Sequence, residues 1–319
     1  IPPSKKVIEA IIAFLSNSHH LNWYPELSNR NLLRALSGYT GCPDENILVT
    51  SGSDEALAAL CDTFLDEGDD VLVPFPTYTH FLIFAKSSGA RVRLVEGRNP
   101  FIKFFDAVLD SIRIDTKLVY LVSPTNPTGI IYDERDIKTL CLRFPETLFI
   151  VDEAYAEFAG HSIIGLVGEF GNLAVTRTFS KSFGIAGLRI GYLAAQKTVL
   201  DSVKKIFNPK SVNSLAQIAA LAALSDMEYH DRYVSEVCES KQILRRELSA
   251  RGLDPVITPA NFILFRVGNP AEFIGRCEEY SVFVRDRSHL KGLEGYVRMN
   301  APTVEQTHEF LRRLDLILG

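Results

Sequence analysis

A single lysine in an apolar, glycine-rich loop is the first candidate for chemistry in this sequence. Lys181 lies in segment 176–192 (TRTFSKSFGIAGLRIGY), together with several hydroxyl groups and two arginines. Most lysines are solvated surface residues. A lysine that forms a Schiff base with a carbonyl compound needs a less hydrated setting, because burial favours the neutral, nucleophilic amine. Lys181 is therefore a candidate for such a lysine, although this segment alone does not exclude a surface residue.

Two further polar segments can hold a ligand. Residues 50–55 (TSGSDE) lie between a strand-like run and a helical pattern, so their free backbone N–H groups offer a seat for a phosphate. Ser53 or Asp54 can also be an ordinary helix cap. Residues 123–129 (SPTNPTG) form a rigid turn that would fix the direction of the Asn126 amide, although a plain connecting turn has the same composition.

A buried acid is the fourth candidate. Residues 151–155 (VDEAY) place Asp152 at the end of an apolar, strand-like run. A carboxylate there is costly unless a charged partner lies against it, and a protonated pyridine nitrogen would be such a partner. The alternative is that Asp152 caps the next helix.

The elements that position these residues alternate between strand and helix from residue 46 onward. This order predicts an α/β fold with a largely parallel sheet. The predicted strands cover residues 47–50, 71–74, 91–95, 117–123, 148–151, 173–176 and 189–194, and the helices among them cover residues 55–65, 81–86 and 134–143. Ligands in such sheets bind at the carboxyl ends of the strands, where segment 123–129 lies.

The pattern changes after residue 196, and this predicts a second, smaller domain. Helical patterns cover residues 199–206, 214–224 and 229–251, and are followed by strand 262–267, helix 272–279, strands 282–285 and 296–300, and helix 304–318. We expect a large domain over residues 21–225 and a small C-terminal α/β domain over residues 226–319. An N-terminal segment, residues 1–20 with a helix over 5–16, would pack on them. Because the sequence starts at Ile1 without an initiator methionine, further upstream residues are expected.

Composition restricts the partners. The 319 residues are 46% hydrophobic and 23% charged, as in ordinary globular proteins, and their net charge of −5 argues against nucleic acid or an anionic membrane as partner. The five cysteines are scattered, which predicts free or buried thiols and no metal site. No apolar run approaches the ~18–20 residues that span a bilayer, and no signal peptide is visible, so a cytoplasmic protein is expected.

The four segments together resemble a known family. The order and spacing of Asp54, Asn126, Asp152, Lys181 and Arg189 are similar to those of fold-type-I pyridoxal-5'-phosphate (PLP) enzymes, and specifically of the class I and II aminotransferases. The resemblance extends over nearly the whole chain. It implies an α/β large domain that binds PLP and a smaller C-terminal domain.

The resemblance also implies a role for each residue near the PLP ring. Lys181 would bind the cofactor aldehyde, give way to the substrate amine and then carry the proton between Cα and C4'. Asp152 would keep the pyridine nitrogen protonated, so that the ring accepts electrons. Asn126 and Tyr155 would hydrogen-bond the phenolate oxygen, and Tyr78 would stack on the ring.

The cofactor phosphate would be held by a separate group of residues. By the same resemblance these are the backbone N–H groups of Ser53 and Asp54, the hydroxyls of Thr178 and Ser180, and the guanidinium of Arg189. Tyr24, in segment 23–26 (WYPE), matches a tyrosine that reaches the phosphate of the neighbouring subunit. The resemblance therefore implies a homodimer.

Within the class, segments 24–26, 180–192 and 260–262 are most similar to histidinol-phosphate aminotransferase. Arg285 and Arg298 match two arginines that lie near the substrate's phosphate in that subfamily, with Asn126 as a further substrate contact. Paired arginines suit a phosphate, although Arg285 can also be a surface salt-bridge residue. This implies transamination between histidinol phosphate and 2-oxoglutarate, a reaction of histidine biosynthesis.

Two departures leave other functions open. The chain continues after Arg298 with residues 299–303 (MNAPT) where the subfamily has a Thr/Ser-Val-Gly-Thr type sequence, and the usual Asn-Glu-Asn-Pro-type segment is absent from the sequence. A threonine-phosphate decarboxylase-like lyase is one alternative, and an aminotransferase of aromatic or other α-amino acids is another. A PLP-fold binding protein without catalysis would lack the lysine or carry a DNA-binding domain. A nicotinamide dehydrogenase is disfavoured, because no GxGxxG follows a strand.

Overall fold

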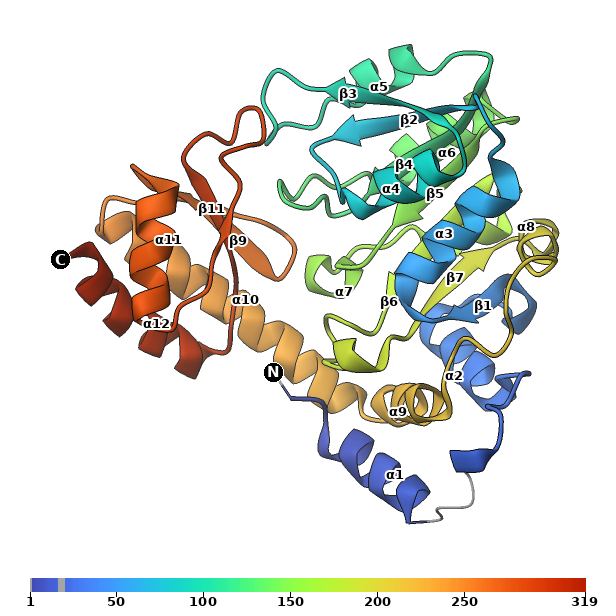
Figure 1. Ribbon diagram of the computed structural model, residues 1–319, viewed down its shortest axis with the longest axis horizontal. Coiled ribbons are helices and arrows are strands. Elements are labelled where there is room, and N and C mark those ends of the chain that lie inside the picture. The colour runs from blue at the N-terminus through green and yellow to red at the C-terminus, as the bar shows by residue number, and fades with distance from the viewer. Residues whose placement is uncertain (1, 17–20) are drawn as a thin grey trace.

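The computed structural model describes residues 2–16 and 21–319, which form a large and a small part joined by one long helix (Figure 1). The expected N-terminal helix is present as α1 (Lys5–Leu15) and packs on α9 (Ser214–Leu224). Within the expected N-terminal segment, Ile1 and residues 17–20 lie outside the described residues.

The large part is built on a seven-stranded sheet in the order β1-β7-β6-β5-β4-β2-β3. Its strands are β1 (Ile47–Thr50), β2 (Asp70–Phe75), β3 (Arg91–Glu96), β4 (Thr116–Val122), β5 (Leu148–Asp152), β6 (Leu173–Thr178) and β7 (Gly191–Ala195). Only β7 is antiparallel to its neighbours. The predicted α/β fold with a mostly parallel sheet is therefore confirmed.

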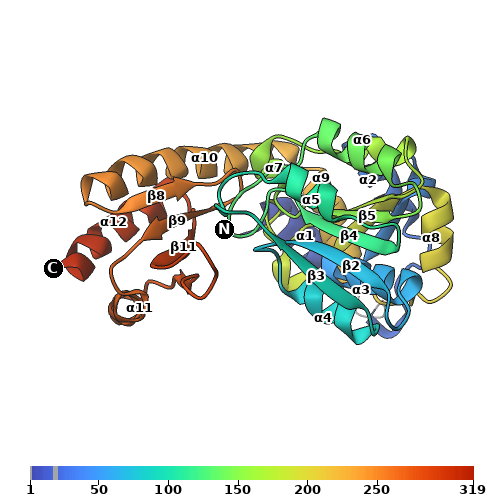
Figure 2. The ribbon, with the colours of Figure 1, turned by 90° about the horizontal axis from the view of Figure 1, so that it is seen from above.

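Helices cover both faces of this sheet, because strand side chains alternate between two cores. In β4, Leu118 and Tyr120 belong to one core, and Val119 and Leu121 to the other. The first core is covered by α3 (Gly52–Phe64), α4 (His80–Ser87) and α8 (Lys197–Val203), and the second by α1, α2 (Arg30–Thr40), α5 (Phe105–Ser111), α6 (Glu134–Arg143) and α9. Figure 2 shows α4 and α6 on opposite sides of the strands.

The small part has its own sheet and core. Its four strands are all antiparallel in the order β10-β11-β9-β8. They are β8 (Asp254–Ile257), β9 (Phe262–Arg266), β10 (Arg285–Asp286) and β11 (Tyr296–Asn300), covered by α10 (Met227–Ala250), α11 (Pro270–Glu279) and α12 (Val304–Leu318). We propose the domain boundary at residues 225–226, just before α10 leaves the large part (Figure 1).

The strand predicted over residues 282–285 is wrong in its position. Ser281 takes a left-handed φ of 56°, and the N–H of Val282 donates to the carbonyl of Cys277, so these residues end α11 instead of starting a strand. Val284 is buried in the small core without strand pairing. Only Arg285–Asp286 pair with β11, which moves the strand toward the cavity described below.

A close approach of backbones at Gly191 fixes the start of α3 against β7. A Cβ at this position would lie 2.5 Å from the carbonyl oxygen of Arg177 and 2.7 Å from the amide nitrogen of Ser53. Both neighbours are backbone atoms of regular elements, so neither can move without shifting its element. Glycine is therefore required at the junction that carries Ser53.

We expect Gly191→Ala to lower the free energy of unfolding by about 1–3 kcal/mol, because it overpacks a backbone contact. Urea denaturation of the cofactor-free protein measures this effect. Gly165→Ala is the matched control, since a Cβ there meets open space. Equal midpoints for the two variants would contradict the prediction.

Candidate active site

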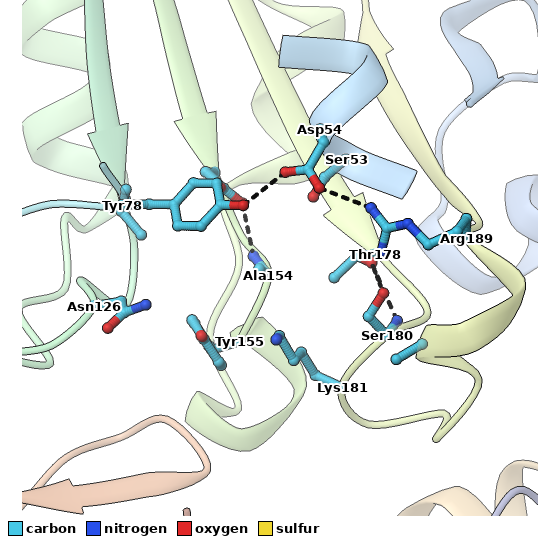
Figure 3. Close-up of a pocket in the computed structure, with 13 residues that line it drawn as sticks. Ser53, Asp54, Tyr78, Asn126, Ala154, Tyr155, Thr178, Ser180, Lys181 and Arg189 are labelled. Atoms are coloured by element: carbon cyan, nitrogen blue, oxygen red, sulfur yellow. Dashed lines mark hydrogen bonds and ion pairs between the residues drawn. The ribbon is translucent and has the colours of Figure 1, made fainter. Parts of the chain in front are cut away.

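Most of the predicted site residues line one cavity at the carboxyl edge of the parallel strands (Figure 3). The lining includes Ser53, Asp54, Tyr78, Asn126, Asp152, Tyr155, Thr178, Ser180, Lys181 and Arg189. They end or follow β1, β2, β4, β5 and β6, or precede β7. Because β7 runs opposite to the others, its first residues reach the same edge as the ends of its neighbours.

Asp152 forms the acidic floor of the cavity. Its side chain is 3% exposed, accepts a hydrogen bond from the Tyr120 hydroxyl at 2.9 Å and another from the N–H of Ala154 at 3.1 Å. No cation among the described residues forms an ion pair with it. Burial raises the pKa of Asp152 to about 6. A buried carboxylate of this kind fits a ligand that brings its own positive charge.

An anion seat lies at the start of α3. Gly52 takes a φ of 76°, and the N–H groups of the first helical turn, those of Ser53 and Asp54 included, have no partner within the helix. Arg189 donates to Asp54 at 2.7 Å, and the Tyr78 hydroxyl donates to the same carboxylate at 2.9 Å. The lack of a side chain at Gly52 leaves room for the Arg189 guanidinium, which would lie 2.8 Å from a Cβ there.

Two hydroxyl groups complete this seat. The Thr178 hydroxyl donates to the Ser180 hydroxyl at 2.9 Å and accepts from the Ser180 N–H at 3.1 Å. Both residues lie in the cavity lining with Arg189. Helix N–H groups, hydroxyls and a guanidinium are the donors that bind phosphate groups in proteins.

Lys181 carries the free amine of the cavity. It is half-buried, and its Nζ lies 5.6 Å from the centre of the Tyr155 ring. Within residues 2–16 and 21–319, no hydrogen bond or ion pair occupies this Nζ. Lys241, which is buried more deeply, donates instead to the carbonyls of Thr258 and Ala260. Burial and, second, the charge of Arg298 lower the pKa of Lys181, which favours the nucleophilic amine.

Asn126 and Arg298 form the opposite wall. Arg298 donates to the Oδ1 of Asn126 at 2.7 Å, and the Nδ2 of Asn126 points toward the cavity (Figure 3). The Arg298 guanidinium lies 5.1 Å from the centre of the Phe262 ring, which also packs edge-on against Tyr155 at 5.3 Å. Burial raises the pKa of Tyr155, so its hydroxyl stays a hydrogen-bond donor.

Gly129, three residues after Asn126, packs closely against the small part of the molecule. A Cβ at this position would lie 2.8 Å from the Pro259 side chain, so a larger residue would not fit without a shift.

A second cavity continues from the first and is strongly positive. The two share Tyr78, Asn126, Tyr155 and Lys181. The further lining includes Arg285, Arg287, His289 and Arg298, so both predicted substrate arginines lie beside Lys181. Arg287 and His289 were not predicted. Arg287 lies one residue beyond the short strand β10, and His289 lies in the turn that follows, so neither belongs to a strand pattern that the local sequence shows.

The structure does not bring Tyr24 to either cavity. Its side chain is 77% exposed, and the Nζ of Lys210 lies 4.4 Å above its ring. The expectation that Tyr24 reaches the site of a neighbouring subunit stays a prediction.

The polar groups around the first cavity fit PLP. An anion seat, a buried carboxylate without a cation, a free amine and the Asn126 amide surround one space, and these groups match the phosphate, the pyridine nitrogen, the aldehyde and the phenolate oxygen of that molecule. In the described part of the chain, no group of three or more His, Cys, Asp or Glu could hold a metal ion. The helices in that part are all too short or too polar to cross a membrane.

Comparison with known proteins gives the family. Residues 2–314 match the model of the family "Aminotransferase class I and II". The chain is 39% identical over 298 residues to a dihydroxyacetone phosphate transaminase of Campylobacter jejuni, covering 91% of this chain and 80% of that protein. It is 32% identical over 326 residues to a histidinol-phosphate aminotransferase of Methanocaldococcus jannaschii, covering 99% and 86%.

The fold matches solved aminotransferase structures. A histidinol-phosphate aminotransferase from Sinorhizobium meliloti, solved in complex with PLP, superposes with a TM-score of 0.90 at 24% identity, covering 99% of this chain and 87% of that chain. At this identity the likeness shows the fold alone. The family match and the relatives above 30% identity carry the assignment: the chain belongs to the class I and II aminotransferases and is a PLP-dependent transaminase.

Proposed function

We propose that this transaminase acts on a small phosphate monoester, with L-histidinol phosphate as amino donor and 2-oxoglutarate as acceptor. The observation that carries the proposal is the positive cavity beside Lys181, to which Arg285 and Arg298 contribute and in whose described lining there is no acidic residue. Guanidinium groups bind phosphates in a bidentate manner, and a local site is needed in a chain of net charge −5.

The residues of the first cavity would hold the cofactor in one orientation. Its phosphate would bind the N–H groups of Ser53 and Asp54, the hydroxyls of Thr178 and Ser180, and Arg189. When bound, PLP supplies an electron sink for the pair that remains at the substrate Cα when its proton leaves. Asp152 would hold the ring nitrogen in its protonated form.

The remaining residues would orient the ring and move the proton. The Nδ2 of Asn126 and the hydroxyl of Tyr155 would donate to the ring oxygen, and Tyr78 would cover the ring face. Lys181 would hold the cofactor until the substrate amine replaces it. Its neutral amine, favoured by burial, would then take the proton from Cα and deliver it to C4'.

A second candidate substrate is dihydroxyacetone phosphate. It is favoured by the 39% identity to the transaminase named for that compound. Both candidates end in a phosphate monoester and carry no carboxylate, so the arginine cavity suits either. They differ in the size of the group next to the reacting carbon.

Single-turnover spectra distinguish the candidates. The bound cofactor absorbs near ~420 nm, and transfer of the amino group moves the band to ~330 nm. We expect L-glutamate and L-histidinol phosphate each to cause this change. If dihydroxyacetone phosphate restores the ~420 nm band after glutamate, and histidinol phosphate is inert, the second candidate holds instead. Release of CO₂ from L-threonine phosphate without the change would indicate the lyase, and a response only to glutamate and aromatic amino acids would exclude a phosphate substrate.

We also propose that the active unit is a homodimer. Besides Tyr24, several large apolar side chains near the N-terminus are exposed in the single chain: Ile8, Ile12, Leu15, Leu21, Trp23 and Leu27. Exposed apolar patches of this kind mark interfaces. Light scattering should give a mass of about twice 35.6 kDa, and a monomer mass for the active enzyme would exclude the proposal.

A further inference from the structure

The short strand β10 brings three arginines onto one face of the small sheet. Arg285 lies opposite Arg298 in the register, and the N–H of Arg287 donates to the carbonyl of Tyr296 at 3.0 Å, which extends the pairing by one residue. Since side chains alternate along a strand, Arg285 and Arg287 share the face of Arg298, whereas Asp286 lies on the other. This face lines the cavity that contains Lys181.

No carboxylate of the described chain neutralises these arginines. The nearest in sequence, Asp286, accepts from the N–H of Ser288 at 2.7 Å and from its hydroxyl at 2.5 Å, and so belongs to a local turn. None of the three arginines takes part in an ion pair with a described residue. Like charges that lie directly opposite each other on neighbouring strands destabilise a sheet. An anion bound between them would reverse this effect.

Arg287 is less hydrated than Arg285. The Arg285 side chain is exposed, whereas that of Arg287 is half-buried. Burial and then the charges of Arg298 and Arg285 lower the pKa of Arg287 to about 10, so it remains protonated at neutral pH. A charge that is partly removed from water interacts more strongly with an anion than an exposed one.

The backbone of Arg287 is fixed before any substrate binds. Its carbonyl accepts from the N–H of Leu290 at 3.0 Å, and Leu290 and Leu293 are buried in a small core with Tyr155. In the same loop, residues 287–295, Lys291 forms an ion pair at 2.7 Å with Glu96, the last residue of β3. Figure 1 shows this loop, before β11, beside the end of β3. Preorganisation of this kind reduces the entropy lost on binding.

We propose that Arg287 is a specificity-determining residue that binds the substrate's phosphate together with Arg298. The inference rests on the proposed function. A phosphate monoester has three terminal oxygens. The Arg298 guanidinium can donate hydrogen bonds to two of them, and Arg287 can then donate to the third. A carboxylate has no third oxygen. Arg287 therefore selects a phosphate over a carboxylate at this end of the cavity.

The test compares a phosphorylated substrate with its dephosphorylated form in the PLP-loaded enzyme. The pair is L-histidinol phosphate and L-histidinol. If the wild type accepts dihydroxyacetone phosphate instead, the pair is dihydroxyacetone phosphate and dihydroxyacetone. We expect Arg287→Gln to lower kcat/KM for the phosphorylated compound about 10- to 100-fold, mainly through KM, as for a lost charge-assisted hydrogen bond. The value for the dephosphorylated compound should not change. Arg287→Lys, which keeps the charge without the fork, should fall between.

Arg266→Gln is the matched control, because Arg266 is an exposed arginine of the same sheet outside both cavities. Inhibition by inorganic phosphate measures anion binding at this position without the rest of the substrate. Inorganic phosphate should inhibit Arg287→Gln more weakly than the wild type. If Arg287→Gln matches Arg266→Gln while the wild type prefers the phosphorylated compound, this inference fails alone. If the wild type has no such preference, the proposed function fails, and the inference with it.

Discussion

Replacing Lys181 with alanine is expected to abolish transamination, with a loss of at least about 10⁴-fold in rate, because the variant loses both the nucleophile and the proton carrier. Lys181 is the only lysine in the described lining of the two cavities. The ~420 nm absorption of the bound cofactor should disappear as well, since it depends on the covalent bond to this amine. Absorption spectra and single-turnover rates measure the two effects separately.

Two variants control for charge and for surface changes. Lys181→Arg keeps the positive charge but offers no amine, so it should be as inactive as Lys181→Ala. Lys205→Ala changes an exposed lysine of the large part, outside both cavities, and should leave activity unchanged. An unchanged ~420 nm band in Lys181→Ala would contradict the assignment of the nucleophile.

Asp152→Asn should affect catalysis and stability in opposite directions. The amide cannot keep a pyridine nitrogen protonated, so we expect activity to fall by about 10²–10⁴-fold. In the cofactor-free protein, however, the same change removes a buried charge. Burial raises the pKa of Asp152 from 3.8 to about 6, so folding favours the protonated carboxyl group. The stability that this protonated group contributes is fully present below pH 3.8 and is lost as the pH rises through 6.

The stability gain of the variant should therefore grow with pH. At pH 8 the cofactor-free Asp152→Asn protein should be more stable than the wild type by up to about 3 kcal/mol, and near pH 4 the two should be similar. Urea denaturation of both cofactor-free proteins at several pH values measures the difference. A gap that stays constant between pH 4 and pH 8 would show that the ionisation of Asp152 does not limit stability.

Most of the strands that carry the candidate site could be predicted from the sequence alone. Strands buried on both faces, such as β4 and β5, appear as continuous apolar runs, and their ends were predicted to within one residue. The polar segments that follow these strands were therefore placed at the edge of the sheet where the cavity lies. Local pattern and the rule for parallel sheets were enough at these positions.

Other elements depend on contacts that the local sequence does not contain. No strand was predicted at β8, which contains Pro255; it is an edge strand, where proline is tolerated. No helix was predicted at α2, whose cap Asn29 has a left-handed φ of 46° and makes no side-chain capping bond. Arg287 was missed because its direction is set by the distant pairing with Tyr296.

The three arginines of the second cavity also have a consequence for how such enzymes diverge. All of them lie between residues 285 and 298, in one short ribbon of the small part, whereas Lys181 and Asp152 lie in the large part. If the arginines bind the substrate as proposed, mutations confined to this ribbon are expected to change the compound that is recognised and to leave the reacting groups in place. Transplanting the ribbon from one relative to another is the corresponding route to a new substrate.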